Sequence, residues 1–449
     1  MSSETEELAK LLKKIQQLEE ELENERQKRK NIEEEFDEHK REFDEHKKLC
    51  ALINKGTPAF VKEDVSHKVH RKLGAPVGHE GYWRRVPERV DFIKPLQVLT
   101  CPCCNGKLSS VQEVRERIVE DLPQISRPVV TKYLIERRYC AQCKKLVEAE
   151  VPDALPGARL GLRVMLLIAF LKIRMAMPED KIVELLQSAH SFIISRAEVV
   201  CALNQVRRAF GSHYADIENK IRDAPIKGCD ETGWRLDGVT HWVWCMISDE
   251  IAWYKVHRRR SYKVIQPVLQ NQQGKVLVSD RLTTYNQLSI ENGCAHQICW
   301  AHILRDSKRL AKNYDEAKTV HRRLKSIFHK AKSLISKATP QDMQHLLARI
   351  DNFGKLHFEH KSIRTFRNSI CKKHRNNLFH FVTNPAVPST NNGTERAIRK
   401  AVIIRKISNG NRSEKGARIL ETMLSIIETI RLKGKDPLDE MHRMLTSRA

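Results

Sequence analysis

The sequence predicts a multidomain α+β protein, in which a coiled coil, a zinc-ribbon-like module and a helical region precede a catalytic core built on a β-sheet. Three patterns support this fold class. The first fifty residues repeat every seven residues, and two Cys-x-x-Cys pairs lie between residues 101 and 143. After residue 223, short apolar strands alternate with helical segments. A chain of 449 residues also exceeds one ordinary core and suggests about two to four domains.

The composition favours a polyanionic partner. Lys and Arg number 80 against 56 Asp and Glu, a surplus of 24 that fits nucleic acid, although membrane-surface binders share it. The longest apolar run, Val164 to Leu171, is too short to cross a bilayer, and the N-terminus lacks an apolar signal segment. We therefore expect a cytoplasmic, nucleoid-associated protein without a membrane partner. Its 12 cysteines would then bind metal rather than form disulfides.

Residues 1–50 carry the heptad pattern of a coiled coil. "EFDEHKR" is followed by "EFDEHKK", and apolar side chains recur at the first and fourth heptad positions: Leu8, Ile15, Leu22, Phe36 and Phe43, and Leu11, Leu18 and Ile32. Arg29 and several polar residues interrupt this stripe. Two interpretations stay open, self-association through the coiled coil and a single solvated helix.

Residues 51–100 form a basic linker or arm. The stretch "HKVHRKLGAPVGHEGYWRR" has neither helical nor strand periodicity. It is either a plain linker or an arm that orders on DNA, where Arg71, Lys72, Arg84 and Arg85 would follow the phosphates.

Residues 101–150 predict a zinc-binding module. Two Cys-x-x-Cys pairs, Cys101 with Cys104 and Cys140 with Cys143, supply the four thiolates of a tetrahedral Zn²⁺ site. Cys103 is an alternative to Cys104, although the spacing favours Cys104. The segment between the pairs is long enough for a short hairpin or helix, and chance or disulfide pairing is the competing explanation.

Residues 155–222 have helical periodicity. "PEDKIVELLQSAH" and "SRAEVVCALNQVRRAF" predict two short helices, the second beginning at a Ser195 cap and ending at Arg207 and Arg208. Two such helices resemble a DNA-binding helix-turn-helix, but helical hairpins without DNA are also common.

Residues 223–410 have the pattern of a catalytic domain. "APIKGCDETGW" leads into a strand pair, "GKVLVSD" gives a further strand, and "HQICWAHILRD" predicts a strand that runs into a helix. This is the order of an RNase H-like sheet, in which acids at neighbouring strand ends converge at one edge. Asp230 and Asp280 each close a predicted strand. Their repulsion raises the pKa of carboxyl groups, and divalent ions, Mg²⁺ or Mn²⁺, would relieve it.

A third acid is expected from "PSTNNGTERAIRKAVIIRK". Glu395 and Arg399 lie one turn apart on the predicted helix, which is either a functional pair or an ordinary surface ion pair. A helical insertion is predicted at about residues 303–384, with Lys and Arg along DNA or on solvated faces. Residues 411–449 are predicted to form a C-terminal helical region.

These motifs resemble transposases of the insertion sequence 66 family. "DETGW", "SDRLTTY", "CWAHILRD" and "NNGTERAIRKAVIIRK" match its motif blocks in order, and the basic arm, the cysteine pairs and the N-terminal heptads also match. The resemblance covers nearly the whole chain. It implies an aspartate–aspartate–glutamate triad of Asp230, Asp280 and Glu395 that binds the catalytic metal.

The resemblance also implies roles for residues near the triad. Glu231 would face away from the metal because adjacent strand residues point to opposite faces. Asn391 and Asn392 match the start of the last catalytic helix, where Thr390 replaces the family's usual aspartate. The neighbours in "CWAH" resemble a Cys-x-x-His element of related transposases, with a capping histidine as the alternative. The two residues of this Cys-x-x-His element are Cys299 and His302. Separately, Arg405 and Lys406 are expected to contact DNA.

The sequence therefore predicts a metal-dependent DNA transposase. It would nick DNA at the ends of a mobile element with water, and then join the freed 3′ hydroxyl to target DNA. Self-association through the coiled coil would hold two ends together, and small accessory proteins of the element are further possible partners. The alternatives are an inactive, regulatory DNA-binding relic and an RNase H-like nuclease unconnected with transposition.

Overall fold

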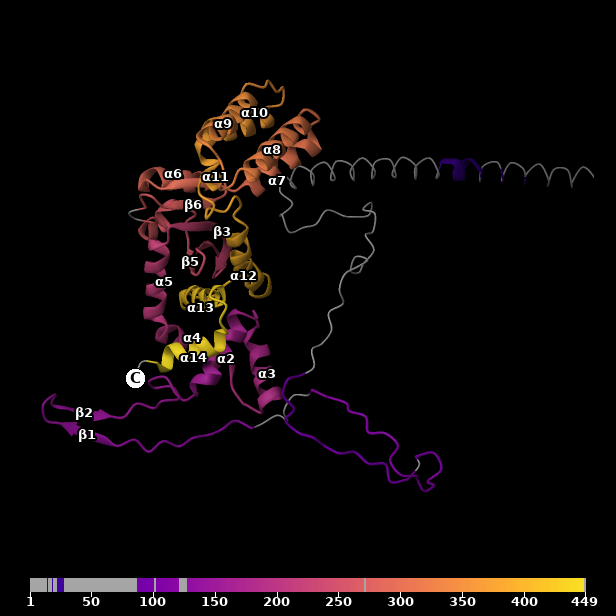
Figure 1. Cartoon of the computed structure of the whole chain (residues 1–449), viewed down its shortest axis with the longest axis vertical. Helices are drawn as coiled ribbons and strands as arrows, with labels where there is room; N and C mark the ends of the chain where they lie inside the picture. The colour runs from indigo at the N-terminus through magenta and orange to yellow at the C-terminus, as the bar shows by residue number, and fades with distance from the viewer. Residues whose placement is uncertain are drawn as a thin grey trace, which may run out of the picture. The chain divides into compact units, whose positions relative to one another are not determined.

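The computed structural model describes residues 14, 18, 22–27, 87–100, 102–120, 127–269 and 272–447. The chain divides into two compact units, Met1–Glu120 and Asp121–Ala449, and Figure 1 shows its elements.

In the first unit, residues 14, 18 and 22–27 are helical, and Leu18 and Leu22 are each more than half exposed. The rest of the predicted coiled coil and most of the basic arm lie outside the described residues. Residues 108–120, where the sequence left a hairpin or a helix open, contain no helix.

The second unit begins with a short antiparallel hairpin and continues with a helical region. These elements are β1 (Arg137–Cys140), β2 (Lys145–Glu148), α2 (Leu162–Ile173), α3 (Glu179–His190), α4 (Arg196–Ala209) and α5 (Gly211–Asp223). The predicted Ser195 cap is confirmed. Its hydroxyl accepts the Glu198 N–H while the Glu198 carboxylate accepts the Ser195 N–H, a reciprocal capping box. The apolar run 164–171 lies in α2, whose buried side chains confirm that it is a core helix.

A mixed five-stranded sheet follows the helical region, in the order β5-β4-β3-β6-β7. Its strands are β3 (Ile226–Leu236), β4 (Val239–Ile247), β5 (Ala252–His257), β6 (Val276–Ser279) and β7 (Ala295–Ile298). β3, β4 and β5 form an antiparallel meander, whereas β3, β6 and β7 run parallel. The sheet therefore has one end at which β3, β6 and β7 all point their carboxyl termini.

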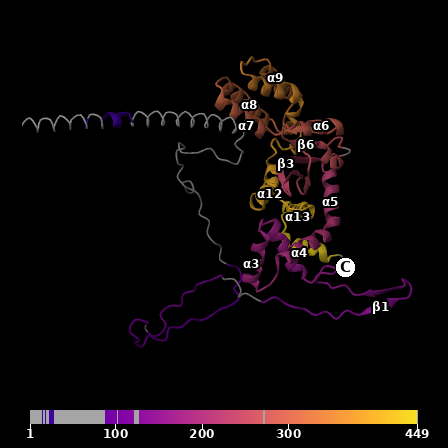
Figure 2. The ribbon, with the colours of Figure 1, turned by 180° about the vertical axis from the view of Figure 1, so that it is seen from behind.

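Helices cover both faces of this sheet, and α5 and α12 lie on opposite sides of it (Figures 1 and 2). Helices η1 (Tyr262–Val264), η2 (Gln266–Leu269) and α6 (Thr283–Asn292) lie between strands in the sequence. After the sheet come α7 (Trp300–Asn313), α8 (Glu316–Ser333), α9 (Pro340–Gly354), α10 (Lys361–Asn368), η3 (Ser369–Lys373), η4 (Arg375–Asn377) and α11 (His380–Thr383). The chain ends with α12 (Asn392–Ser408), α13 (Glu414–Leu432) and α14 (Pro437–Thr446).

The helices from α7 to α11 share a second hydrophobic core with Val278 of β6 and Ile298 of β7, and this core is separate from the main core that contains α13. Trp300 is at its centre, stacked on Phe328 at 5.1 Å between ring centroids. Arg281, the residue after Asp280, ties this helical layer to the strand end. It binds the Asp306 carboxylate on α7 and lies over the Phe366 ring at 4.9 Å.

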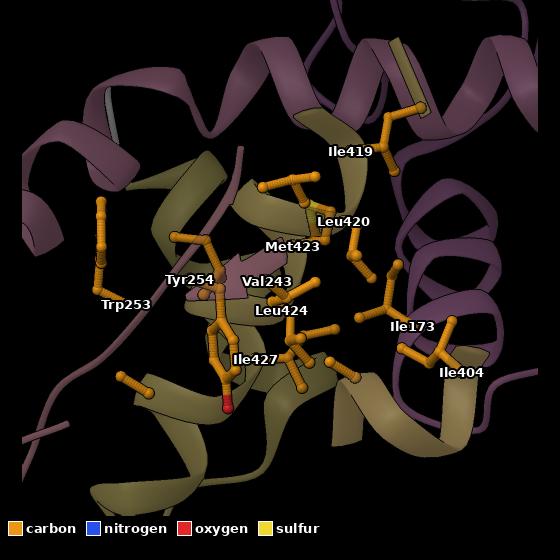
Figure 3. Packing of buried hydrophobic residues seen from close by; sticks show 14 of the residues in the cluster. Ile173, Val243, Trp253, Tyr254, Ile404, Ile419, Leu420, Met423, Leu424 and Ile427 are labelled. Atoms are coloured by element: carbon orange, nitrogen blue, oxygen red, sulfur yellow. The ribbon is translucent and has the colours of Figure 1, made fainter. Parts of the chain in front are cut away.

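Helix α13 packs at the centre of the main core. Figure 3 shows its side chains at Leu420, Met423 and Leu424 among those of Val243 and Tyr254 from the sheet. Ile404 of α12 and Ile173 of α2 lie close by in the same view. Helix α13 thus joins the sheet to the helical region that precedes it.

The same helix also covers the free edge of the sheet. Among the described residues, β5 pairs with no strand other than β4. Three α13 side chains spaced one turn apart accept hydrogen bonds from its backbone N–H groups. The N–H groups of Ala252, Tyr254 and Val256 donate to Thr429 Oγ1, Ser425 Oγ and Glu421 Oε1 at 3.0, 2.9 and 2.7 Å. A helix thereby replaces the missing neighbour and prevents pairing with another chain at this edge.

We predict that Ser425→Ala lowers the free energy of unfolding by about 1–3 kcal/mol, because it leaves the buried Tyr254 N–H without an acceptor. The matched control is Ser333→Ala, an exposed helical serine that only bonds back to Lys330. It should change stability by less than about 0.5 kcal/mol. Urea unfolding curves measure both variants, and equal effects would contradict the proposed role of the α13 stripe.

Candidate active site

The register of the parallel strands places Asp230 and Asp280 side by side. Gly228 of β3 pairs with Val278 of β6. Asp230 and Asp280 each follow their paired residue by two positions, so the strand register places them opposite each other. The predicted strand before Asp280 is confirmed, because β6 ends at Ser279. The prediction that Asp230 closes its strand is wrong: β3 continues to Leu236 because its antiparallel pairing with β4 extends beyond its parallel pairing with β6.

The start of α12 lies against the Asp230 face of β3. A Cβ atom at Gly228 would meet Thr394 Oγ1 at 2.0 Å, so only glycine permits this close approach. Asn391 is buried and fixes the contact from the helix side. Its Nδ2 donates to the Cys229 carbonyl at 2.8 Å, and its backbone N–H donates to Cys299 Sγ at 3.1 Å. Because Glu395 is in the first turn of α12, this docking brings it to the aspartates.

The Asp230 carboxylate is largely buried and experiences the charges of three other acids. Burial is the main cause that raises the pKa of Asp230 to about 7, and the charges of Glu231, Asp280 and Glu395 contribute to the same rise. The backbone N–H of Glu231 donates to Asp230 Oδ1 at 2.9 Å and acts in the opposite direction. A cluster of oxygen ligands whose charges oppose one another fits a hard divalent cation.

Glu231 lies on the other face of β3. Its side chain is only 3% exposed, and Arg260 donates to it from Nε at 2.8 Å and from Nη2 at 2.6 Å. The Tyr285 hydroxyl of α6 donates to its second oxygen. The Arg260 guanidinium also lies over the Trp242 ring at 4.5 Å. These contacts neutralise the carboxylate of Glu231 and fix the backbone beside Asp230.

The N-terminus of α7 meets Glu395 on its other side. His302 Nδ1 lies 3.6 Å from Glu395 Oε1, and Arg305 Nη2 lies 3.7 Å from Oε2. Cys299, His302 and Glu395 offer ligand atoms that all lie within 4.8 Å of one another. Among the described residues, the basic groups that pair with Glu395 thus come from α7, whereas Arg399 and Asn392 are exposed.

The sequence did not reveal several of these neighbours. Arg305 follows His302 by one turn and shares its helix face, so helical spacing in "CWAHILRD" contained a signal for it. Arg260 is the last of three consecutive arginines, and Tyr285 has the sequence pattern of a buried residue on one face of α6. Neither has a local signal, because both meet Glu231 only through the fold.

The described cysteines of the predicted zinc module lie in tight turns. Cys140 ends β1, and the Cys143 N–H donates to Cys140 Sγ at 3.4 Å. This bond is the main cause that lowers the pKa of the Cys140 thiol, as suits a metal-binding thiolate. In the first unit, the chain turns back after Cys104, so that a Cβ at Gly106 would be 3.3 Å from its sulfur. Cys101 lies outside the described residues.

The residues predicted to contact DNA fall into separate groups. Arg71, Lys72, Arg84 and Arg85 lie outside the described residues. At the end of α4, burial and the charges of Arg208 and Arg418 lower the pKa of Arg207. Arg405 donates to Thr232 Oγ1 at 3.1 Å and to the Gly233 carbonyl, so its guanidinium helps to hold α12 on β3.

We predict that Asp230→Asn stabilises the protein in buffer without Mg²⁺ or Mn²⁺. The folded-state pKa of Asp230 is about 7 against an ordinary 3.8. Its contribution is therefore fully present at low pH and is lost as the pH rises from about 4 to 7. The charged form costs on the order of 4 kcal/mol at most, so the variant should gain more stability at pH 8 than at pH 5.

Urea unfolding at the two pH values measures this difference. Asp249→Asn, in the exposed turn between β4 and β5, is the matched control and should show no such gain. Addition of Mg²⁺ should stabilise the unmodified chain and not the Asp230 variant. A stability gain that is equal at pH 5 and pH 8 would show that the folded state does not raise the pKa of Asp230.

Comparison with known proteins identifies similar sequences. A family model described as "Transposase IS66 family" matches residues 157–419, more than half of the chain, and this range includes all three acids. A model described as "zinc-finger binding domain of transposase IS66" matches residues 99–144, which include both cysteine pairs.

Among curated proteins, the chain is similar to "Uncharacterized protein y4qI" of Sinorhizobium fredii (strain NBRC 101917 / NGR234). The two are 33% identical over 93 residues, which are 21% of this chain and only 17% of that relative. Within the described residues, no helix combines the length and the apolar composition needed to span a membrane.

Proposed function

Because the chain belongs to the IS66 family of transposases and carries the zinc-finger domain of that family, we propose that it cuts and joins DNA strands at a site formed by Asp230, Asp280 and Glu395. The observation that carries the proposal is the strand register that sets Asp230 level with Asp280, together with the docking of the first turn of α12, which contains Glu395, against Gly228 and Cys229 of β3. Strand order supports an RNase H-like core, since β3, the β4–β5 hairpin, β6 and β7 follow one another as such a sheet requires.

In this proposal, the three carboxylates hold Mg²⁺ or Mn²⁺ ions, which would activate the attacking oxygen and stabilise the leaving oxygen of a phosphodiester. Asp230 and Asp280 supply oxygens from adjacent strands, and Glu395 supplies its oxygen from α12. Asn391 positions Glu395 by holding the first turn of that helix. Arg305, which is largely exposed beside Glu395, is placed to bind a phosphate oxygen of the DNA.

The same residues serve both chemical steps. Water attacks the phosphorus at the element end, and the strand leaves as a 3′ hydroxyl. That hydroxyl then attacks a target phosphodiester, so each bond formed replaces one broken. Because both in-line attacks can use the same three carboxylates, the reaction does not require a second cluster of acids.

DNA binding would come from the arginines at the end of α4 and from the zinc module. The charges of Arg208 and Arg418 both act on the guanidinium group of Arg207, and a bound phosphate would relieve that repulsion. Helices α3 and α4 are proposed to act as a helix-turn-helix. Zn²⁺ would be held by Cys101, Cys104, Cys140 and Cys143, with Cys103 as the alternative to Cys104. The N-terminal heptads would join protomers.

An inactive DNA-binding relic is disfavoured, because the chain has all three acids and a buried hydrogen bond from Asn391 to the Cys229 carbonyl holds the start of the Glu395 helix against the Asp230 strand. A nuclease unconnected with transposition remains a separate candidate, and strand joining distinguishes it from a transposase.

We predict that Asp230→Asn, Asp280→Asn and Glu395→Gln each reduce Mg²⁺-dependent cleavage of element-end DNA by roughly 1,000-fold or more, since each removes a ligand of ions that supply several kcal/mol. End binding in a gel assay should persist, because it depends on distant basic residues. Glu231→Gln is the matched control and should lose only about tenfold, because Glu231 faces Arg260 rather than the site. Near-normal cleavage by any triad variant would show that the wrong acid is assigned. Cleavage without strand joining would favour the nuclease.

A further inference from the structure

Two buried polar atoms beside the triad have no hydrogen-bond partner. Within the described part of the chain, His302 Nδ1 and Glu395 Oε1 are both buried atoms that make no hydrogen bond. They face each other at 3.6 Å, which is too long for a hydrogen bond. Two ligands of one tetrahedral Zn²⁺ ion lie about 3.3–3.7 Å apart, given bond lengths of about 2.0–2.3 Å. The separation therefore suits an ion between them.

A sulfur atom completes the set. Cys299 Sγ lies with these two atoms in a cluster whose ligand atoms are all within 4.8 Å of one another. Cys299 and His302 are at the start of α7, and Glu395 is in the first turn of α12. Two helix N-termini thus converge on the cluster, and each favours negative charge near it.

The groups around Cys299 hold the sulfur in place for an ion. Asn391 donates its N–H to Cys299 Sγ, and the Trp300 N–H donates to the Ser389 carbonyl at 3.1 Å. Burial is the main cause that raises the pKa of the Cys299 thiol, although backbone N–H groups oppose it. A bound metal ion deprotonates a coordinating thiol outright, and the fixed N–H donor then supports the thiolate.

We propose that Cys299, His302 and Glu395 form a second metal site, which takes a thiophilic divalent ion such as Zn²⁺ or Co²⁺. The ion accepts electron pairs from Cys299 Sγ, His302 Nδ1 and Glu395 Oε1, and the thiol proton passes to solvent. Sulfur and nitrogen ligands select against Mg²⁺, which requires oxygen. Three protein ligands leave a fourth position open, unlike a closed structural zinc site. Arg305 pairs with the other oxygen, Oε2, and leaves Oε1 for the ion.

Occupation of this site has a regulatory consequence that rests on the proposed function. Glu395 would be shared between the thiophilic ion and the Mg²⁺ ions, so Zn²⁺ at the second site withdraws a ligand from cleavage. Zn²⁺ should therefore inhibit the Mg²⁺-dependent reaction.

The test titrates the full chain, stripped of metal, with Co²⁺ and records thiolate-to-cobalt charge-transfer absorption. Cys140→Ser and Cys143→Ser are introduced together, so that the zinc module contributes less to the spectrum. In this background we expect a thiolate-bearing Co²⁺ signal that Cys299→Ser reduces to the residual signal of the zinc module. His302→Gln should weaken Co²⁺ binding at least about tenfold, whereas Cys201→Ser, at an exposed cysteine of α4, should change nothing.

Two outcomes overturn the proposal: a signal unchanged by both Cys299→Ser and His302→Gln, or no thiolate-bearing Co²⁺ beyond that of the zinc module. Circular dichroism checks that the variants fold. Because Cys299 is fully buried, the partly exposed His302 provides the second, milder variant. In cleavage assays, His302→Gln should raise the Zn²⁺ concentration for half-inhibition at least about tenfold. If no chain cleaves DNA, the proposed function fails, while the Co²⁺ spectra still decide the metal site.

Discussion

The burial of the Asp230 carboxylate beside other acids at one end of the sheet is the constraint to which the rest of the structure responds. The charges of Glu231, Asp280 and Glu395 all act on Asp230, and the burial of Asp230 makes that repulsion stronger than it would be in water. Without an ion, the cluster opposes folding, so the contacts that hold it must come from elsewhere. Most of the surrounding features can be understood as such contacts.

The supporting contacts act from three sides. On the face opposite the site, Arg260 and Tyr285 neutralise Glu231 and stiffen β3. On the Asp230 face, α12 docks through Gly228 and Asn391. Beyond the sheet edge, α13 binds the backbone of β5 and packs against the side chains of α12 and α2 (Figure 3). These contacts support the strand and the helix that carry the acids, as a preorganised metal site would require.

Local signals in the sequence predicted local features well. Ser195 was identified as a cap because its partner, Glu198, lies three residues away. The strand before Asp280 was identifiable because a short apolar run precedes the acid. The extent of β3 was not, since the pairing that carries it past Asp230 depends on β4. For the same reason the partners of Glu231, and the third ligand beside Cys299 and His302, had no signal: each contact joins segments far apart in the chain.

The most direct test of the account is the position of bound Mn²⁺ in crystals of the full chain, located by anomalous scattering. The account predicts Mn²⁺ about 2.2 Å from carboxylate oxygens of Asp230 and Asp280, with Glu395 completing a pair of ions about 3.5–4 Å apart. Mn²⁺ bound at Glu231, or absent from the sheet end while it occupies other acids, would contradict it.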